Sequence, residues 1–172
     1  MNIRTTSIAL ALLAIVTVSF GAKPESTGPD PDVIIKNLYK AHAAQKGPFA
    51  DKENLKALQQ YFTKELATLI RKDAIESKGE VGAYGFDPLY ESQDPQIKNF
   101  KVGEVQWGGI LKREDDEPED GLAVVVVTFT DNGKRRSIPF RFDQQPDKSW
   151  KIADINYSDG SSLAGLIRDA YK

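Results

Sequence analysis

The stretch Leu122–Asp143, LAVVVVTFTDNGKRRSIPFRFD, decides the fold. Its first part, Leu122–Thr130, is rich in β-branched residues and is typical of a buried strand. Asp131-Asn132-Gly133 then predicts a tight hairpin, because Asn and Gly accept the positive φ of a type I′ turn. The return strand, Lys134–Asp143, places three apolar side chains on one face: Ile138, Phe140 and Phe142. Pro139 lies on the opposite face and lacks an amide hydrogen, so we expect an edge or a bulge there.

Further β-rich segments lie on either side of this hairpin. Phe100, Val102, Val105 and Trp107 indicate a strand that begins near Ile97. After a turn at residues 145–148, Trp150, Ile152 and Ile155 indicate a third β-rich segment that runs to Tyr157. Asp159 and Gly160 then turn the chain, and Ser161 or Ser162 caps a short closing helix. The back half therefore predicts an antiparallel meander of about four strands.

The front half of the chain has the period of helices. Apolar residues at helical spacing continue from Val33 to about Gln45, and Gly47-Pro48 ends that helix. A second helix begins near Asp51 and restarts after Phe62, because threonine at position 63 is a better cap than a helix interior residue. Its apolar stripe consists of Leu55, Leu58, Phe62, Leu66, Leu69 and Ile70. Residues 80–96 form an irregular loop whose aromatic side chains we expect to pack on the core. The fold class is α+β: N-terminal helices on a curved antiparallel sheet, with a short C-terminal helix.

The first residues indicate export. Ile8–Val18 is an apolar run too short to span a bilayer comfortably, but of the right length for a secretory signal. We expect residues 1–21 to be a signal peptide cleaved after Gly21 or Ala22, residues 22–31 a flexible leader and residues 32–172 a single domain. The predicted location is periplasmic or secreted, with no stable membrane anchor after cleavage. The chain has no cysteine, which excludes disulfides, thiolate metal sites and a lipid anchor. Its net charge of −2 argues against nucleic-acid binding.

Several of these segments together resemble a known family. They are the helix stripe LQQYFTKEL from Leu58 to Leu66, the loop motif Phe86-Asp87-Pro88-Leu89, the hairpin, and WKIADI from Trp150 to Ile155. In these segments the chain resembles exported bacterial proteins grouped as domain-of-unknown-function family 3828. The resemblance implies a cystatin-like cone, similar to nuclear transport factor 2 and ketosteroid isomerase. It carries no established chemistry, so it implies no catalytic residue. Related folds often dimerise through the outer face of the sheet, which makes a homodimer a further candidate by analogy.

Carboxylates and tyrosines supply the candidate ligand-binding residues. Asp87 and Asp94 each precede a proline, an arrangement in which the carboxylate usually accepts backbone N–H bonds of its own turn. The functional alternative is a carboxylate pair that binds a cation or polar ligand at the mouth of the cone. Strand alternation places Asp154 on the face of Trp150 and Ile152, and a carboxylate buried there could act as a general base. Tyr157 or Tyr84 could then supply a phenol to a developing oxyanion.

Two other features have simple structural interpretations. His42, the only histidine, lies beside the apolar stripe of the first helix; it could act as a general base, but such a residue is more often packed or at the solvent edge. Glu114–Asp120 contains six acids in seven positions, yet it lacks the ligand spacing of a calcium-binding loop, so a solvated loop is expected. No phosphate-binding loop, nucleophile elbow or zinc-binding helix motif occurs. We therefore expect neither a metal nor a cofactor.

These observations favour an exported, non-catalytic binding domain whose ligand is a small apolar molecule or a protein partner. One alternative is a small isomerase- or hydratase-like enzyme that uses the Asp154 carboxylate in the cone. Another is an inhibitor or immunity-type protein that blocks a target with its loops.

Overall fold

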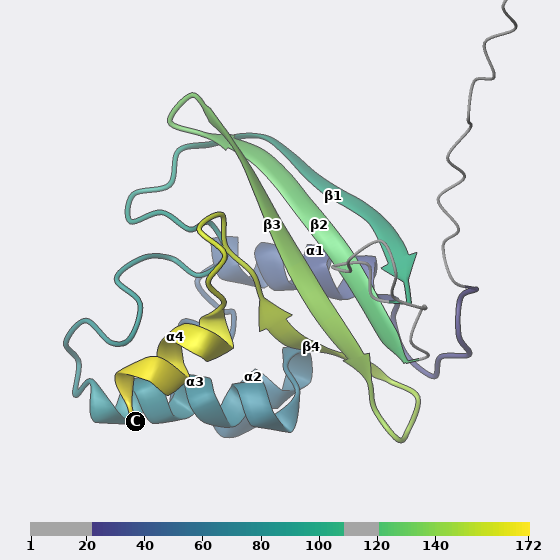
Figure 1. Ribbon diagram of the computed structural model, residues 1–172, viewed down its shortest axis with the longest axis horizontal. Coiled ribbons are helices and arrows are strands. Elements are labelled where there is room, and N and C mark those ends of the chain that lie inside the picture. The colour runs from purple at the N-terminus through teal and green to yellow at the C-terminus, as the bar shows by residue number, and fades with distance from the viewer. Residues whose placement is uncertain (1–21, 109–120) are drawn as a thin grey trace, which may run out of the picture.

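Four antiparallel strands pair in sequence order, β1-β2-β3-β4 (Figure 1). The computed structural model describes residues 22–108 and 121–172, and within them the strands are β1 (Ile97–Trp107), β2 (Leu122–Asp131), β3 (Lys134–Gln144) and β4 (Trp150–Ile155). The β2–β3 hairpin turns at Asn132 and Gly133, whose φ angles are 48° and 80°. Positive φ at both positions is what a type I′ turn requires, so the predicted hairpin is confirmed.

Four helices occur in the described part of the chain: α1 (Pro31–Ala43), α2 (Leu55–Tyr61), α3 (Lys64–Glu76) and α4 (Leu163–Ala170). Three of them, α2, α3 and α4, begin at a residue whose side chain caps the N-terminus, whereas Asp30 before α1 makes no such hydrogen bond. The second helix starts later than expected, because the side chain of Asn54 accepts the amide of Ala57 at 3.1 Å and fixes the N-terminus there. The predicted restart is confirmed: Thr63 Oγ1 accepts the amide of Leu66 at 3.3 Å. Among the described residues, no helix combines the length and apolarity needed to cross a bilayer.

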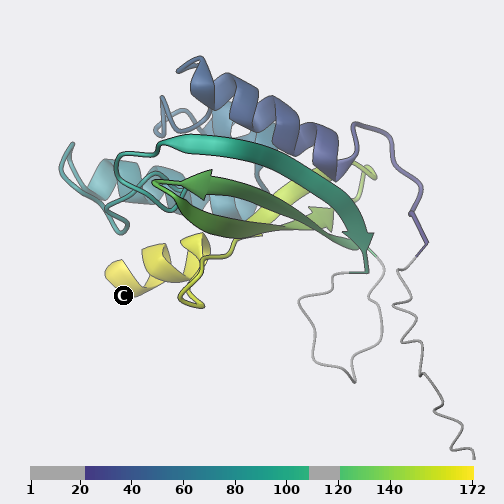
Figure 2. The ribbon, with the colours of Figure 1, turned by 90° about the horizontal axis from the view of Figure 1, so that it is seen from above.

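The core joins the helices to a bent sheet, with α1 on one side of the sheet and α4 on the other (Figure 2). Helix α1 packs on β1 and β2, whereas α2, α3 and α4 pack at β4. The α2–α3 junction is tied directly to the sheet, since the amide of Thr63 donates to the carbonyl of Ile152 at 2.9 Å. One buried cluster joins the helix stripe to the strands, and it includes Leu58, Phe62, Leu66, Val125, Phe140 and Ile152. The predicted α+β architecture is thereby confirmed.

Irregular pairing bends the edge strands. β1 slips against β2 twice, between Lys98 and Lys101 and between Val102 and Val105. Gly103 lies within the second irregularity, where an added Cβ would be 2.8 Å from the carbonyl oxygen of Val126, so the backbones approach closely only because the residue is glycine. Such bulges increase twist and interrupt an edge that could otherwise pair with another chain.

A third irregularity reverses the alternation of β4. Ile152 pairs with Phe142, but Asp154 pairs with Arg141, so Ala153 is an extra residue between them. Asp154 consequently lies on the same face as Arg141, which is exposed, and the expectation that it shares the face of Trp150 and Ile152 is wrong. The physical reason is the bulge, which changes the side of the sheet on which every later residue lies.

Pro139 shows how a central strand accommodates a proline. The β3–β4 ladder ends at the pair Phe140–Ile155, so the part of β3 before Phe140 has no β4 partner. The carbonyl of Pro139 accepts the amide of Asn156 at 2.9 Å, just beyond the end of β4. Within a strand, the N–H and C=O of one residue point to the same side. Pro139 therefore lacks its N–H on the side that faces β4, where the β3–β4 ladder has already ended, so no ladder hydrogen bond is lost. The predicted edge is therefore a local one.

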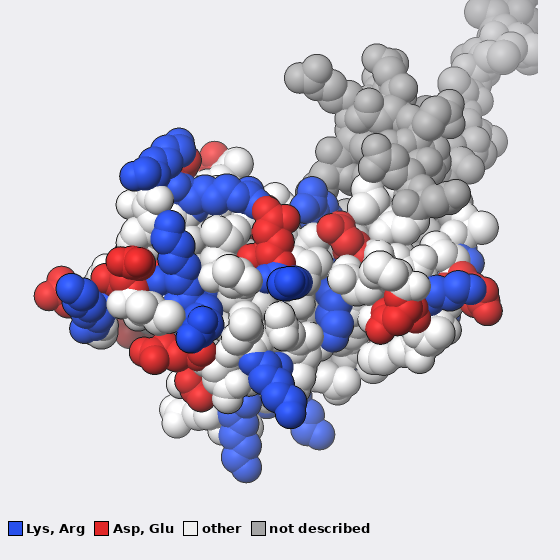
Figure 3. All heavy atoms as spheres, turned by 90° about the horizontal axis from the view of Figure 1, so that it is seen from below, with Lys and Arg blue, Asp and Glu red and all other residues white. Residues whose placement is uncertain are grey.

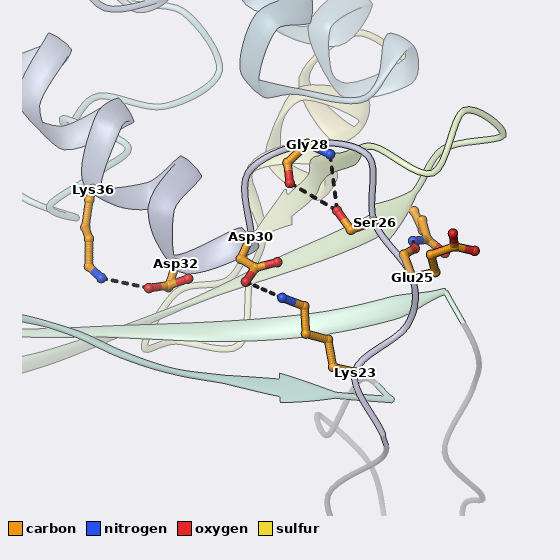
Figure 4. A network of polar contacts seen from close by, with 8 residues as sticks. Lys23, Glu25, Ser26, Gly28, Asp30, Asp32 and Lys36 are labelled. Carbon is orange, nitrogen blue, oxygen red and sulfur yellow. Dashed lines mark hydrogen bonds and ion pairs between the residues drawn. The ribbon is translucent and has the colours of Figure 1, made fainter.

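Residues 22–30 run beside the β3–β4 turn before α1 begins (Figure 4). Gln144 Nε2 donates to the carbonyl of Glu25 at 2.6 Å, Thr27 Oγ1 donates to that of Asp147 at 2.7 Å, and the side chains of Glu25 and Lys148 form an ion pair. Lys23 Nζ lies 2.6 Å from Asp30 Oδ2. The predicted signal peptide and the acidic run at 114–120 lie outside the described residues.

Candidate functional site

Buried tyrosines hold the loop between α3 and β1 against the helical layer. Tyr39 of α1 donates its hydroxyl to the carbonyl of Leu89 at 2.6 Å, and Tyr157, beyond β4, donates to that of Pro88 at 3.4 Å. Burial raises the pKa of both tyrosines, so both remain neutral donors at neutral pH. The aromatic loop thus packs on the core, as the sequence predicted.

This loop brings an aspartate onto the only histidine. His42 Nε2 lies 2.6 Å from Asp87 Oδ2, and Asp87 Oδ1 accepts the amide of Leu89 at 2.9 Å. Because an ionised carboxylate only accepts hydrogen bonds, Nε2 is the donor, and Nδ1 of a neutral imidazole is left as an acceptor. The two side chains are 21% and 20% exposed, so the pair can be reached from solvent. Sequence reasoning named both residues but did not predict that they meet.

The pair lines the first of two adjoining hollows. The first, which we call the histidine hollow, has a volume of about 610 Å³ and is lined by His42, Ala43, Gln45, Phe49, Ala50, Asp87, Tyr90 and Pro95. The second, the aromatic hollow, has a volume of about 370 Å³ and is lined by Lys36, Tyr39, Lys40, Ala43, Tyr90, Ile97 and Phe100. Ala43 and Tyr90 line both, so the two hollows meet at the last turn of α1.

Aromatic rings form the wall of this double hollow. The ring of Tyr39 lies 4.7 Å from that of Phe100 and 5.5 Å from that of Tyr90. Tyr90 also meets the buried ring of Phe129 edge-on at 5.6 Å, which fixes its position from the core side. Phe100 remains 42% exposed although it is large and apolar. A ring held in this way offers a ready apolar contact to a molecule that enters the hollow.

Asp94, the other loop carboxylate, lies in a different environment from Asp87. It is exposed, and its backbone carbonyl accepts from Asn132 Nδ2 at 3.4 Å. It is absent from the described residues that line either hollow. Asp87 instead makes the turn contacts expected of an aspartate before proline, in addition to its contact with His42.

Asp154 serves the closing helix. Its Oδ1 accepts the amides of Ile155 at 2.9 Å and Ala164 at 3.0 Å, while Ser162 Oγ accepts the amide of Gly165 at 3.2 Å. The carboxylate therefore satisfies a free N–H at the start of α4, where negative charge is also favoured by the helix dipole.

The two candidate phenols are buried rather than open to a ligand. The hydroxyl of Tyr84 finds no hydrogen-bond partner within the described residues, and Lys52 Nζ lies 5.2 Å from the centre of its ring. Tyr157 uses its hydroxyl on the loop, as described above. Neither tyrosine forms a hydrogen bond with the carboxylate of Asp154 among the described residues.

The face of the molecule shown in Figure 3 carries charges of both signs. Seen from below, Lys and Arg side chains are interspersed with Asp and Glu (Figure 3). A mixed face of this kind does not produce the single-sign field with which proteins attract nucleic acid.

Fold and site together define an α+β domain that carries an open, aromatic-lined double hollow beside its first helix. No family model matches the chain, so the resemblance to family 3828 stays a prediction, and no curated protein matches it either. Among solved structures, the chain is similar to a phospholipid-binding protein from Ralstonia solanacearum, solved in complex with a phospholipid. The identity is 23%, the match covers 81% of this chain and 73% of that chain, and the TM-score is 0.34.

Proposed function

We propose that the protein is exported and binds a small amphipathic molecule in the two adjoining hollows, without catalysing a reaction on it. The observation that carries this proposal is the junction at Ala43 and Tyr90, which joins an apolar, ring-lined hollow to one that holds a His–Asp pair. Both volumes lie in the range of roughly 300–1,000 Å³ that is usual for small-molecule sites.

The lining of the hollows supports an amphipathic ligand. At one end Phe100 and Ile97 offer apolar surface, and burying such surface is the main source of affinity for a small molecule. At the other end His42 and Asp87 offer a few polar atoms in fixed positions, which can orient a ligand. A molecule with both a polar and an apolar part fits this mixed lining better than a purely apolar one.

Binding is better supported than catalysis. His42 Nδ1 could accept a proton, but no serine, threonine or cysteine is among the described residues that line the histidine hollow. Asp154, the carboxylate that the enzyme hypothesis needs, accepts hydrogen bonds from the backbone amides of Ile155 and Ala164. These contacts favour a helix-capping role for Asp154 over a role as a general base.

Blocking the junction tests the proposal. The mature chain is titrated with N-phenyl-1-naphthylamine, a neutral fluorophore whose emission rises in an apolar site. Ala43→Trp places a bulky ring where the hollows meet, and we expect it to weaken binding about tenfold or more, since a filled hollow cannot bury the probe. Ala44→Trp is the matched control: Ala44 is the next residue, is also exposed and lines neither hollow, so it should leave affinity unchanged. Equal affinities of the two variants, or no binding by the wild-type chain, would contradict the proposal.

A further inference from the structure

We infer that the ligand carries an anionic head group, which binds the ammonium groups of Lys36 and Lys40 at the rim of the aromatic hollow. This inference rests on the proposed binding function and names the class of ligand: a single-chain amphiphile with a carboxylate, sulfate or phosphate head.

The two lysines differ in how much of their charge is available. Lys36 Nζ already lies 2.7 Å from Asp32 Oδ2, one turn earlier in α1. Lys40 has no ion pair within the described part of the chain, although its side chain lines the hollow. Lys40 is therefore the principal anion-binding group, and Lys36 adds a second cation one turn away. A pair of exposed ammonium groups favours an anion over a neutral head group of the same size.

The rest of the aromatic hollow fits an alkyl chain. Long lysine side chains can lay their methylene groups along an apolar wall and keep the ammonium group in water. Tyr39, Phe100 and Ile97 supply that wall, and Tyr90 closes it at the junction with the histidine hollow. The head group can thus remain at the rim, beside the lysines, while the chain lies against the rings.

Charge at the opposite end fixes the orientation. Asp87 lies in the histidine hollow, which includes no lysine or arginine among its described lining residues. A carboxylate there disfavours a second anion, because like charges at short range repel. The anionic head therefore belongs at the Lys40 end, and the chain points toward Ala43.

Displacement of the same neutral fluorophore by amphiphiles with matched chains tests the charge of the head. The competitors are decanoate, decyl phosphate, decanol and decyltrimethylammonium, each kept below its micelle concentration. We expect at least one of the two anions to compete about fivefold better than decanol, an advantage that shrinks as salt rises, and the cation to compete least. Decanoate and decyl phosphate distinguish a carboxylate head from a phosphate head, and success of either supports the inference.

Two variants assign the effect to the lysine. Lys40→Gln should remove most of the advantage of the anion and leave decanol unchanged, and Lys40→Glu should shift the preference toward the cation. Lys46→Gln is the control, since Lys46 is exposed and lines neither hollow. The inference is overturned if decanol competes as well as both anions, if the cation competes best, or if Lys40→Gln weakens all four competitors equally. If the fluorophore itself does not bind, the proposed function fails instead.

Discussion

Replacing Asp154 by alanine should destabilise the protein without affecting ligand binding. The change removes the acceptor for two backbone amides, at Ala164 in the first turn of α4 and at Ile155. Loss of a capping side chain costs roughly 0.5–2 kcal/mol, and leaving an amide unpaired in a half-buried place adds about 1 kcal/mol. We therefore expect a loss of about 2 kcal/mol, which in a domain of this size lowers Tm by about 4–8 °C.

The measurement is urea unfolding followed by the fluorescence of Trp107 and Trp150, whose rings lie 5.5 Å apart at the core. Asp154→Asn keeps one oxygen acceptor and should lose only about 0.5 kcal/mol, mostly the interaction of the charge with the helix dipole. Asp169→Ala, an exposed change in the same helix, should leave stability unchanged. The reasoning is refuted if Asp154→Ala is as stable as the wild-type chain. A loss of activity toward a substrate with no loss of stability would restore the enzyme hypothesis.

Three further predictions concern the buried tyrosines and the N-terminus. Tyr84→Phe should leave stability unchanged or raise it by up to about 1 kcal/mol, because its buried hydroxyl has no partner among the described residues, and a clear loss in urea unfolding would contradict this. Burial raises the pKa of Tyr39, Tyr84 and Tyr157 above the value of about 10 in an unfolded chain. The preference of the folded state for neutral tyrosines therefore contributes its full stability below about pH 10. This stability is lost as the pH rises above about 10 toward the pKa values of the folded protein. Equal stability at about pH 9 and about pH 11 would contradict this prediction. For export, protein recovered from the periplasm or medium should begin at Ala22 or Lys23 by N-terminal sequencing, whereas a chain that still begins at Met1 would contradict cleavage.

The fold was largely predictable because its determinants are local. The Asn132-Gly133 turn needs only residues that accept positive φ, and the restart at Thr63 needs only a cap followed by a helix. The apolar stripe around Phe62 repeats with the period of a helix, and the apolar residues around Phe140 alternate with the period of a strand. Since each pattern exposes one apolar face, packing the two faces together follows almost directly.

The face of Asp154 was not predictable because it depends on pairing between strands. Alternation assumes a regular ladder, and the bulge at Ala153 is decided by how β4 meets β3 and by the start of α4. One extra residue was enough to move the carboxylate from the expected cone interior to the N-terminus of a helix. The enzyme hypothesis depended on this single position.

Like the face of Asp154, the His42–Asp87 pair depends on tertiary contacts and not on local sequence. The two residues are 45 positions apart, and nothing in either local sequence indicates the other. Tyr39, one turn before His42 on α1, donates its hydroxyl to the carbonyl of Leu89, two residues after Asp87, and so holds the loop against α1. The same contact that folds the loop onto α1 therefore orients the carboxylate on the imidazole and closes one wall of the hollow.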